Sequence, residues 1–189
     1  MVLTGDITVL RPLAITDAAL TFRWRQSQRA KFLQRGAKTV EAQEQWIATA
    51  VQSRDLNFIM EFRDEPVGMI ALQEMNHLHK NAVLGRLLIG EPEKVGNAPV
   101  AFEAELLLLD HLFLDLDFHK LYGEIAEDNI AMIKTRDFLG YHRDGLLRDH
   151  YNFDGTFKNA VAVSLLKNEY VQTTRKKLVD LIRLLGRMG

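Results

Sequence analysis

The sequence predicts an α+β fold, in which a mixed, mainly antiparallel central sheet is flanked by helices and contains one parallel strand pair. Three observations lead to this prediction. Short turns separate strand-like segments in the middle and near the end of the chain, and capping residues precede two helical segments near the front. One strand–helix–strand crossover joins residues 82–89 to residues 121–126, and a connection of this length makes the two strands parallel neighbours.

The individual elements follow from local patterns. Thr16 or Asp17 can cap a helix that runs through Trp24, and Thr39 can cap a second helix. Asp154-Gly155 is typical of a hairpin turn between two late strands. The expected strands, in chain order, are residues 7–10, 57–62, 67–73, 82–89, 121–126, 146–153 and 157–166.

Composition limits the function classes. The chain has 189 residues, a formal net charge of −1 and no cysteine, which excludes disulfides, cysteine-ligated zinc and thiol catalysis. The near-neutral charge favours neither a nucleic acid nor a membrane as partner, and no secretory signal opens the sequence, so we expect a cytoplasmic protein. We expect one domain over residues 1–170, followed by a basic amphipathic helix over residues 171–189 that packs on the domain or on a second subunit of a homodimer.

A glycine-bearing loop precedes the crossover helix. Its sequence is GEPEKVGNAPV, residues 90–100, and it follows the strand at residues 82–89. Gly96 lets a ligand approach the backbone, Asn97 can cap the helix, and Pro99 suits the first turn, whose amides have no partner inside the helix. Lys94 adds positive charge. The loop is therefore suited to an anion such as a pyrophosphate, although a plain turn has the same features.

The chain resembles the GNAT superfamily of acyl-CoA N-acyltransferases. Residues 93–98, EKVGNA, are similar to the family's Gln/Arg-x-x-Gly-x-Gly/Ala loop. A second family signature is matched, in order, by Asn129, Leu139-Gly140-Tyr141, Gly145, Arg148 and Gly155. The resemblance spans residues 7–170. It comes nearest to the branch that acetylates N-termini of ribosomal proteins or nucleotide-linked amino sugars.

The resemblance implies acetyl-CoA as co-substrate, bound where the parallel strands splay apart at the active site. An amide near Leu88 would stabilise the acetyl oxyanion. Two positions depart from the family: Glu93 stands where Gln or Arg is usual, and Arg136 stands where many members have a proton-donating tyrosine. The implied cofactor-binding residues are Leu88, Ile89, Gly90, Lys94, Val95, Gly96, Asn97, Ala98, Asn129 and Arg136.

Two residues are candidates for the base that deprotonates the acceptor amine. Glu74 lies at the end of a central strand, and His77 lies in the loop that follows. Both would be ordinary solvated residues if the site lies elsewhere. His77 and His79 have a spacing found in metal sites, but no third ligand stands near them, so we expect no metal.

The acceptor is indicated faintly by Trp24, Arg25 and Gln26, which resemble a Trp-Arg-Asn element of amino-sugar acetyltransferases. The alternative, to which we give equal weight, is that Trp24 anchors the helix in the core and Arg25 is solvated. We therefore expect an N-acetyltransferase whose acceptor is a nucleotide-linked amino sugar or a peptide N-terminal amine. A GNAT-fold module that binds acetyl-CoA or a partner without turnover is the alternative.

Overall fold

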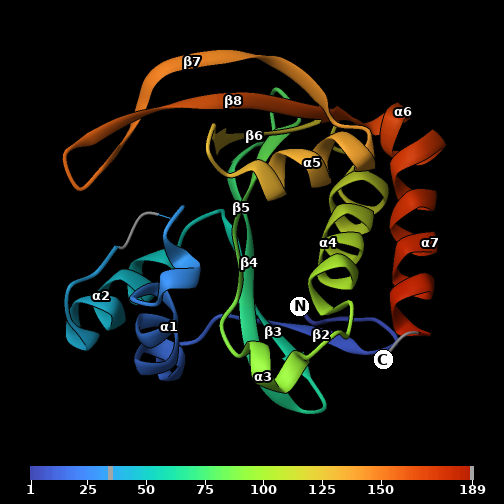
Figure 1. Cartoon of the computed structure of the whole chain (residues 1–189). Coiled ribbons are helices and arrows are strands. Elements are labelled where there is room, and N and C mark those ends of the chain that lie inside the picture. The colour runs from blue at the N-terminus through green and yellow to red at the C-terminus, as the bar shows by residue number, and fades with distance from the viewer. Residues whose placement is uncertain (34–35, 188–189) are drawn as a thin grey trace.

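Eight strands form one sheet in the order β1-β2-β3-β4-β5-β6-β8-β7, and every neighbouring pair is antiparallel except β5–β6. The structure is a computed structural model and describes residues 1–33 and 36–187 (Figure 1). The predicted fold class is confirmed. The strands are β1 Leu3–Thr4, β2 Thr8–Pro12, β3 Leu56–Phe62, β4 Glu65–Asn76, β5 Asn81–Ile89, β6 Lys120–Ala126, β7 His142–Phe153 and β8 Thr156–Leu166.

Helices cover both faces of the sheet. In Figure 1, α1 and α2 lie on one side of β3, β4 and β5, and α4 and α7 lie on the other. The helices are α1 Ala18–Arg25, α2 Val40–Ala50, α3 Pro92–Val95, α4 Val100–Asp110, α5 Ile130–Leu139, α6 Lys167–Glu169 and α7 Arg175–Gly186. A 3-10 turn follows α1 at Gln28–Ala30, and a π-helical turn extends α4 through His111–Asp115.

Each face of the sheet has its own apolar core. Trp24 and Ile47 from α1 and α2 pack with Leu88 of β5 in the smaller one. The larger core includes Leu108 of α4 and Leu178 of α7. Because successive residues of a strand point to opposite faces, apolar side chains on both faces bury the middle of β3 and β4, whereas most of β5 is only partly buried.

The parallel pair separates after a short contact. Only three residue pairs join β5 to β6, the last being Val83 with Tyr122. Further along β5 there is a bulge opposite β4. Gly85 pairs with Ala71 and Leu88 pairs with Met69, so Arg86 and Leu87 together lie opposite the single residue Ile70, and Arg86 has φ +55°. Such a bulge bends a strand, so β5 diverges from β6 beyond Val83. The predicted splayed parallel pair is therefore present.

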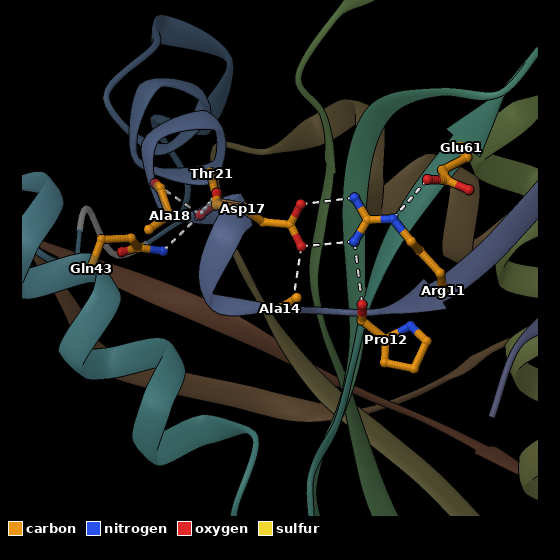
Figure 2. A network of polar contacts seen from close by, with 8 residues as sticks. All are labelled: Arg11, Pro12, Ala14, Asp17, Ala18, Thr21, Gln43 and Glu61. Carbon is orange, nitrogen blue, oxygen red and sulfur yellow. Dashed lines mark hydrogen bonds and ion pairs between the residues drawn. The ribbon is translucent and has the colours of Figure 1, made fainter.

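A polar network fixes the start of α1 against the sheet (Figure 2). Arg11 of β2 forms a bidentate pair with Asp17, at 2.7 and 2.8 Å, and its Nε donates to Glu61 of β3. Asp17 also accepts the Ala14 amide at 2.9 Å. Asp17 holds the N-cap position of α1, which was one of the two positions expected, but its carboxylate is engaged by Arg11 and Ala14 and makes no capping hydrogen bond to the helix.

The loop before α4 differs in detail from its prediction. It contains the single helical turn α3, and the N-cap of α4 is Pro99, without a side-chain cap. Neither the Asn97 cap nor a Pro99 in the first turn is present. Pro99 still suits this end of the helix, since it has no amide to leave unpaired.

The C-terminal segment packs on the domain. Leu178 of α7 is fully buried in the larger core, and the Thr174 hydroxyl donates to the Leu139 carbonyl at 2.8 Å. Arg175 pairs with Asp110 of α4 at 2.8 Å. Residues 171–187 thus share the core of the preceding domain, which was one of the two positions expected for this helix.

Candidate active site

A cleft of about 810 Å³ opens where β5 and β6 diverge. Both faces of the sheet contribute to it. Arg25 and Arg29 reach it from α1 and the turn after it, while Asn129 and Met132 reach it from α5. The strand residues that line it include Gln73, Glu74, Leu84, Gly85, Arg86, Leu87, Tyr122, Gly123 and Glu124.

Glu74, the residue predicted as the catalytic base, lines this cleft. It belongs to an irregular part of β4, with φ +52°, and its amide donates to Asp55 Oδ1 at 2.9 Å. The Tyr122 hydroxyl donates to Glu74 Oε2 at 3.1 Å. Burial raises the pKa of Tyr122, and the hydrogen bond to Glu74 raises it further. The phenol therefore stays protonated and holds the Glu74 carboxylate in place.

His77 lies elsewhere. It is exposed in the turn between β4 and β5, where its ring packs edge-on against Phe118 at 5.3 Å between centroids. It is not among the residues that line the cleft. The two candidate bases are thus separated, and only Glu74 is positioned to contact an acceptor.

Of the three predicted acceptor contacts, only Arg25 lines the cleft. Trp24 is 1% exposed, and its indole Nε1 donates to Glu91 Oε1 at 2.8 Å. A Cβ on Gly90 would come within 2.2–2.4 Å of the Trp24 ring, so only glycine fits there. Trp24 therefore fixes the loop after β5 and has no surface left for a ligand. Gln26 donates to the Ala37 carbonyl instead.

The backbone at the end of β5 is partly occupied. The Gly90 amide donates to the Val67 carbonyl at 2.8 Å, and the Ile89 carbonyl accepts from Arg29 Nε at 3.1 Å. The Leu88 side chain is buried in the core under α1 and α2. The free edge of β5 that a ligand strand can use therefore lies mainly before Leu88, between the end of β6 pairing and the bulge.

The predicted anion loop borders a smaller cavity of about 200 Å³, lined by Ile89, Val95, Gly96, Asn97 and Ala98 together with Leu185 of α7. Gly96 has φ +56° and ψ −126°, and a Cβ built there meets nothing within 4 Å. The adjoining first turn of α4 presents amides with no partner inside the helix. Lys94 points elsewhere and pairs with Glu65 of β4.

Asn129 and Arg136 both line the cleft, as predicted for cofactor-binding residues, and each also has a structural partner. The Asn129 side chain caps α5 by accepting the Met132 amide at 3.4 Å. Arg136 is buried and pairs with Glu105 of α4, which also accepts the Tyr141 hydroxyl at 3.0 Å. Burial acts to lower the pKa of Arg136, but the charge of Glu105, the influence of Tyr141 and the hydrogen bond to Glu105 together raise that pKa above its ordinary value. The guanidinium is therefore committed to Glu105.

Sequence reasoning did not single out Tyr122, Arg86 or Glu124 for this site. Glu124 pairs with His150 at 2.9 Å, and Tyr151 donates to the Glu124 carbonyl at 3.1 Å. Burial, with help from Glu124, raises the pKa of Tyr151 to about 12. Arg86 could have been found as the single charge inside the apolar strand NAVLGRLLI.

Residues 1–33 and 36–187 contain neither a metal-binding cluster nor a membrane-spanning helix. No group of three or more histidine, aspartate and glutamate side chains is arranged to hold a metal ion. No helix in this part of the chain combines the length and apolar character needed to cross a membrane.

Comparisons with known proteins agree with this architecture. A family model described as "Acetyltransferase (GNAT) domain" matches residues 8–142. The spermidine N(1)-acetyltransferase of Escherichia coli K12 is 29% identical over 114 residues, which are 60% of this chain and 60% of that protein. The chain thus matches less than two thirds of the length of this relative.

Solved structures show the same fold at lower identity. A GCN5-related N-acetyltransferase from Brucella melitensis gives a TM-score of 0.78 at 19% identity, over 95% of this chain and 84% of that one. Spermidine N-acetyltransferase from Vibrio cholerae, in complex with CoA and spermine, gives a TM-score of 0.77 at 18% identity. This match covers 89% of this chain and 100% of that one.

Proposed function

We propose that this chain, which belongs to the GNAT acetyltransferase domain family, transfers an acetyl group from acetyl-CoA to an amine. The observation that carries the proposal is the cleft formed where β5 leaves β6 after Val83. The strand edge opened there can pair with an extended ligand as an added strand would. The amine attacks the thioester carbonyl directly, and an amide and the CoA thiol are the products.

The loop residues fit the phosphates of acetyl-CoA. Gly96 leaves open space beside the backbone, and the start of α4 carries positive partial charge. Asn97 and Ala98 line the same cavity. Lys94 and Arg136 contribute less than the family resemblance implied, because acidic side chains already hold them.

Glu74 is the base in this proposal. An amine with a lysine-like pKa costs roughly 4.6 kcal/mol to deprotonate at pH 7, so a carboxylate within the cleft lowers that barrier. Tyr151 also lines the cleft, and its raised pKa keeps it protonated. In this proposal its hydroxyl, which otherwise donates to the Glu124 carbonyl, turns to donate a hydrogen bond to the departing thiolate. The chemistry thus needs no covalent enzyme intermediate.

The acceptor remains to be identified among amines. Spermidine is a candidate acceptor because a relative is named for it. Nucleotide-linked amino sugars and peptide N-termini are candidates because of the sequence resemblance. A module that binds acetyl-CoA without turnover is the second candidate. The pairing of Lys94 with Glu65 and of Arg136 with Glu105 favours it, since both remove charges that would hold the cofactor.

One assay separates these candidates. Thiol release from acetyl-CoA is measured with spermidine, amino sugars, their phosphates and short peptides. Amine-dependent release identifies an acetyltransferase. Binding of acetyl-CoA by calorimetry, with no release for any amine, identifies the silent module.

Gly96→Glu tests where acetyl-CoA binds. The substitution places a side chain and a negative charge in the loop cavity, and each charge-assisted hydrogen bond lost is worth about 1.5–3 kcal/mol. We expect calorimetric affinity for acetyl-CoA to fall at least tenfold. Gly96→Ala is the matched control, because it adds the same backbone strain at φ +56° without the charge. Unchanged affinity in the glutamate variant would remove this loop from the cofactor site.

A further inference from the structure

The cleft contains more positive charge than its own acidic groups neutralise. Arg25, Arg29 and Arg86 line it from α1, the turn after α1, and β5. None of the three forms an ion pair within residues 1–33 and 36–187. A group of arginines gathered in one concave site without carboxylate partners needs an explanation, because partly buried charges are costly.

Arg25 is the least satisfied of them. Its side chain is partly buried, and its Nε is shielded from solvent without a hydrogen-bond partner among the described residues. Burial, together with the smaller effect of the neighbouring Arg86 charge, lowers the pKa of Arg25 to about 10. An anion beside this guanidinium would supply both the missing acceptor and the missing countercharge.

Arg86 is held in place but not neutralised. Its guanidinium packs over the Trp46 ring at 4.7 Å, and one nitrogen donates to the neutral Asn57 Oδ1 at 2.5 Å. Burial lowers the pKa of Arg86, and the charge of Asp55, which forms no ion pair with it, opposes this effect only in part. Stacking on an aromatic ring fixes the guanidinium plane, so its remaining donors can bind a planar carboxylate or a phosphate bidentately.

Two acidic residues, Glu74 and Glu124, line the cleft with these arginines. Glu74 and Glu124 belong to β4 and β6, and Glu124 is already paired with His150. The cleft therefore offers one free carboxylate beside Tyr122 and a separate group of arginines. A molecule with several positive charges and no negative one, such as spermidine, would meet repulsion on the arginine side.

We propose that the acceptor amine belongs to a molecule that also carries a carboxylate or a phosphate, which Arg25 and Arg86 bind while the amine lies toward Glu74. This inference rests on the proposed acetyltransferase function and narrows its substrate class. Arg29, whose Nε is engaged by the Ile89 carbonyl, lies at the junction of this cleft with the smaller cavity, since it lines both.

Matched pairs of amines test the proposal. Thiol release is compared for glucosamine 6-phosphate against glucosamine, for alanylalanine against alanylalaninamide, and for spermidine. The first pair tests a phosphate and the second a carboxylate. In at least one pair, we expect the amine that carries the phosphate or carboxylate to have a kcat/KM at least tenfold above that of the partner without this anion, and above that of spermidine.

Arginine variants connect this preference to the residues. Arg25→Gln and Arg86→Gln should each raise KM for the preferred amine by roughly ten- to hundredfold, with a smaller effect on kcat and none on the neutral partner. Arg25→Lys should keep part of the preference. Arg183→Gln, an exposed position on α7, is the matched control and should behave as wild type. Thermal melts confirm that each variant is folded.

Calorimetry of the same amines, with CoA present, keeps this test separate from the acetyltransferase assignment. If no amine is acetylated but the anionic members bind and Arg25→Gln abolishes that binding, the anion site stands and the enzymatic assignment fails. If amines are acetylated with spermidine preferred, or with no change in Arg25→Gln, the anion site is overturned and the enzymatic assignment stands. Absence of binding by every anionic amine also overturns the anion site.

Discussion

At the scale of single residues, the carboxylate of Glu74 and the hydroxyl of Tyr122 form the pair on which the proposed chemistry depends. The hydroxyl donates to Oε2 at 3.1 Å, and both residues line the cleft. The raised pKa of Tyr122 keeps its hydroxyl protonated, so this hydroxyl remains a hydrogen-bond donor that holds the Glu74 carboxylate in position as a base. The irregular part of β4 that carries Glu74 is held by the hydrogen bond from the Glu74 amide to Asp55.

Glu74→Gln should lower turnover by roughly ten- to ten-thousandfold, the usual range for a general base, and leave acetyl-CoA affinity unchanged. Tyr122→Phe removes the hydrogen bond and should produce a smaller loss, and the double variant should be less damaging than the sum of both. Steady-state kinetics across pH measure these effects. His77→Ala is the control outside the cleft. If His77→Ala alone loses the acidic limb of the pH profile, Glu74 is not the base.

At the scale of elements, α1 is attached to the loop after β5 through one carboxylate. Glu91 accepts the Trp24 indole proton at 2.8 Å and pairs with Arg23. The hydrogen bond from Trp24 lowers the pKa of Glu91, and Arg23 adds to this effect against the opposing influence of burial. This contact places α1, and with it Arg25, next to the end of β5.

Glu91→Gln should therefore destabilise the fold at neutral pH by about 1 kcal/mol, a value reduced because the carboxylate is partly solvated. A carboxyl whose pKa is lowered by folding stabilises the protein above its ordinary value of 4.5, and this contribution is lost as the pH falls. The difference in unfolding free energy between wild type and variant should thus shrink below pH 4.5. Urea titrations at several pH values measure it, and a constant difference would contradict the linkage.

The buried Arg136–Glu105 pair attaches α5 to α4. Arg136→Met leaves an uncompensated buried carboxylate and should cost about 3–5 kcal/mol, whereas Arg136→Met with Glu105→Leu should recover most of that loss. Urea unfolding measures both variants. Calorimetry on the folded double variant should give wild-type affinity for acetyl-CoA. If the double variant is fully stable but binds acetyl-CoA more weakly than wild type, Arg136 contributes to cofactor binding.

Much of the fold could be predicted because its signals are local. The strand at residues 57–62, the hairpin turn at Asp154-Gly155 and the helix capped by Thr39 depend on neighbours in sequence, and each is present. The roles of Trp24 and Arg136 could not be predicted, because their partners Glu91 and Glu105 lie 67 and 31 residues away. The cleft itself was expected, but the arginines that meet in it come from separate elements.

At the scale of the whole molecule, the two faces of the sheet have different tasks. The face under α4, α5 and α7 carries the larger core and the glycine loop, and the face under α1 and α2 carries Arg25 and Arg86 (Figure 1). The cleft between β5 and β6 connects the two faces. In the proposed reaction the cofactor loop therefore lies on one side of the sheet and the acceptor on the other, and the acetyl group is transferred between the strands.

Hydrogen–deuterium exchange of the full chain, with and without saturating acetyl-CoA, tests this central claim most directly. Amides at the free edge of β5, residues 84–88, and in the loop and first turn of α4, residues 94–102, should become protected together. The distant β7–β8 turn at residues 153–156 serves as the internal reference and should exchange unchanged. Protection that omits residues 84–88, or that appears only outside these two segments, would contradict the placement of the reaction in this cleft.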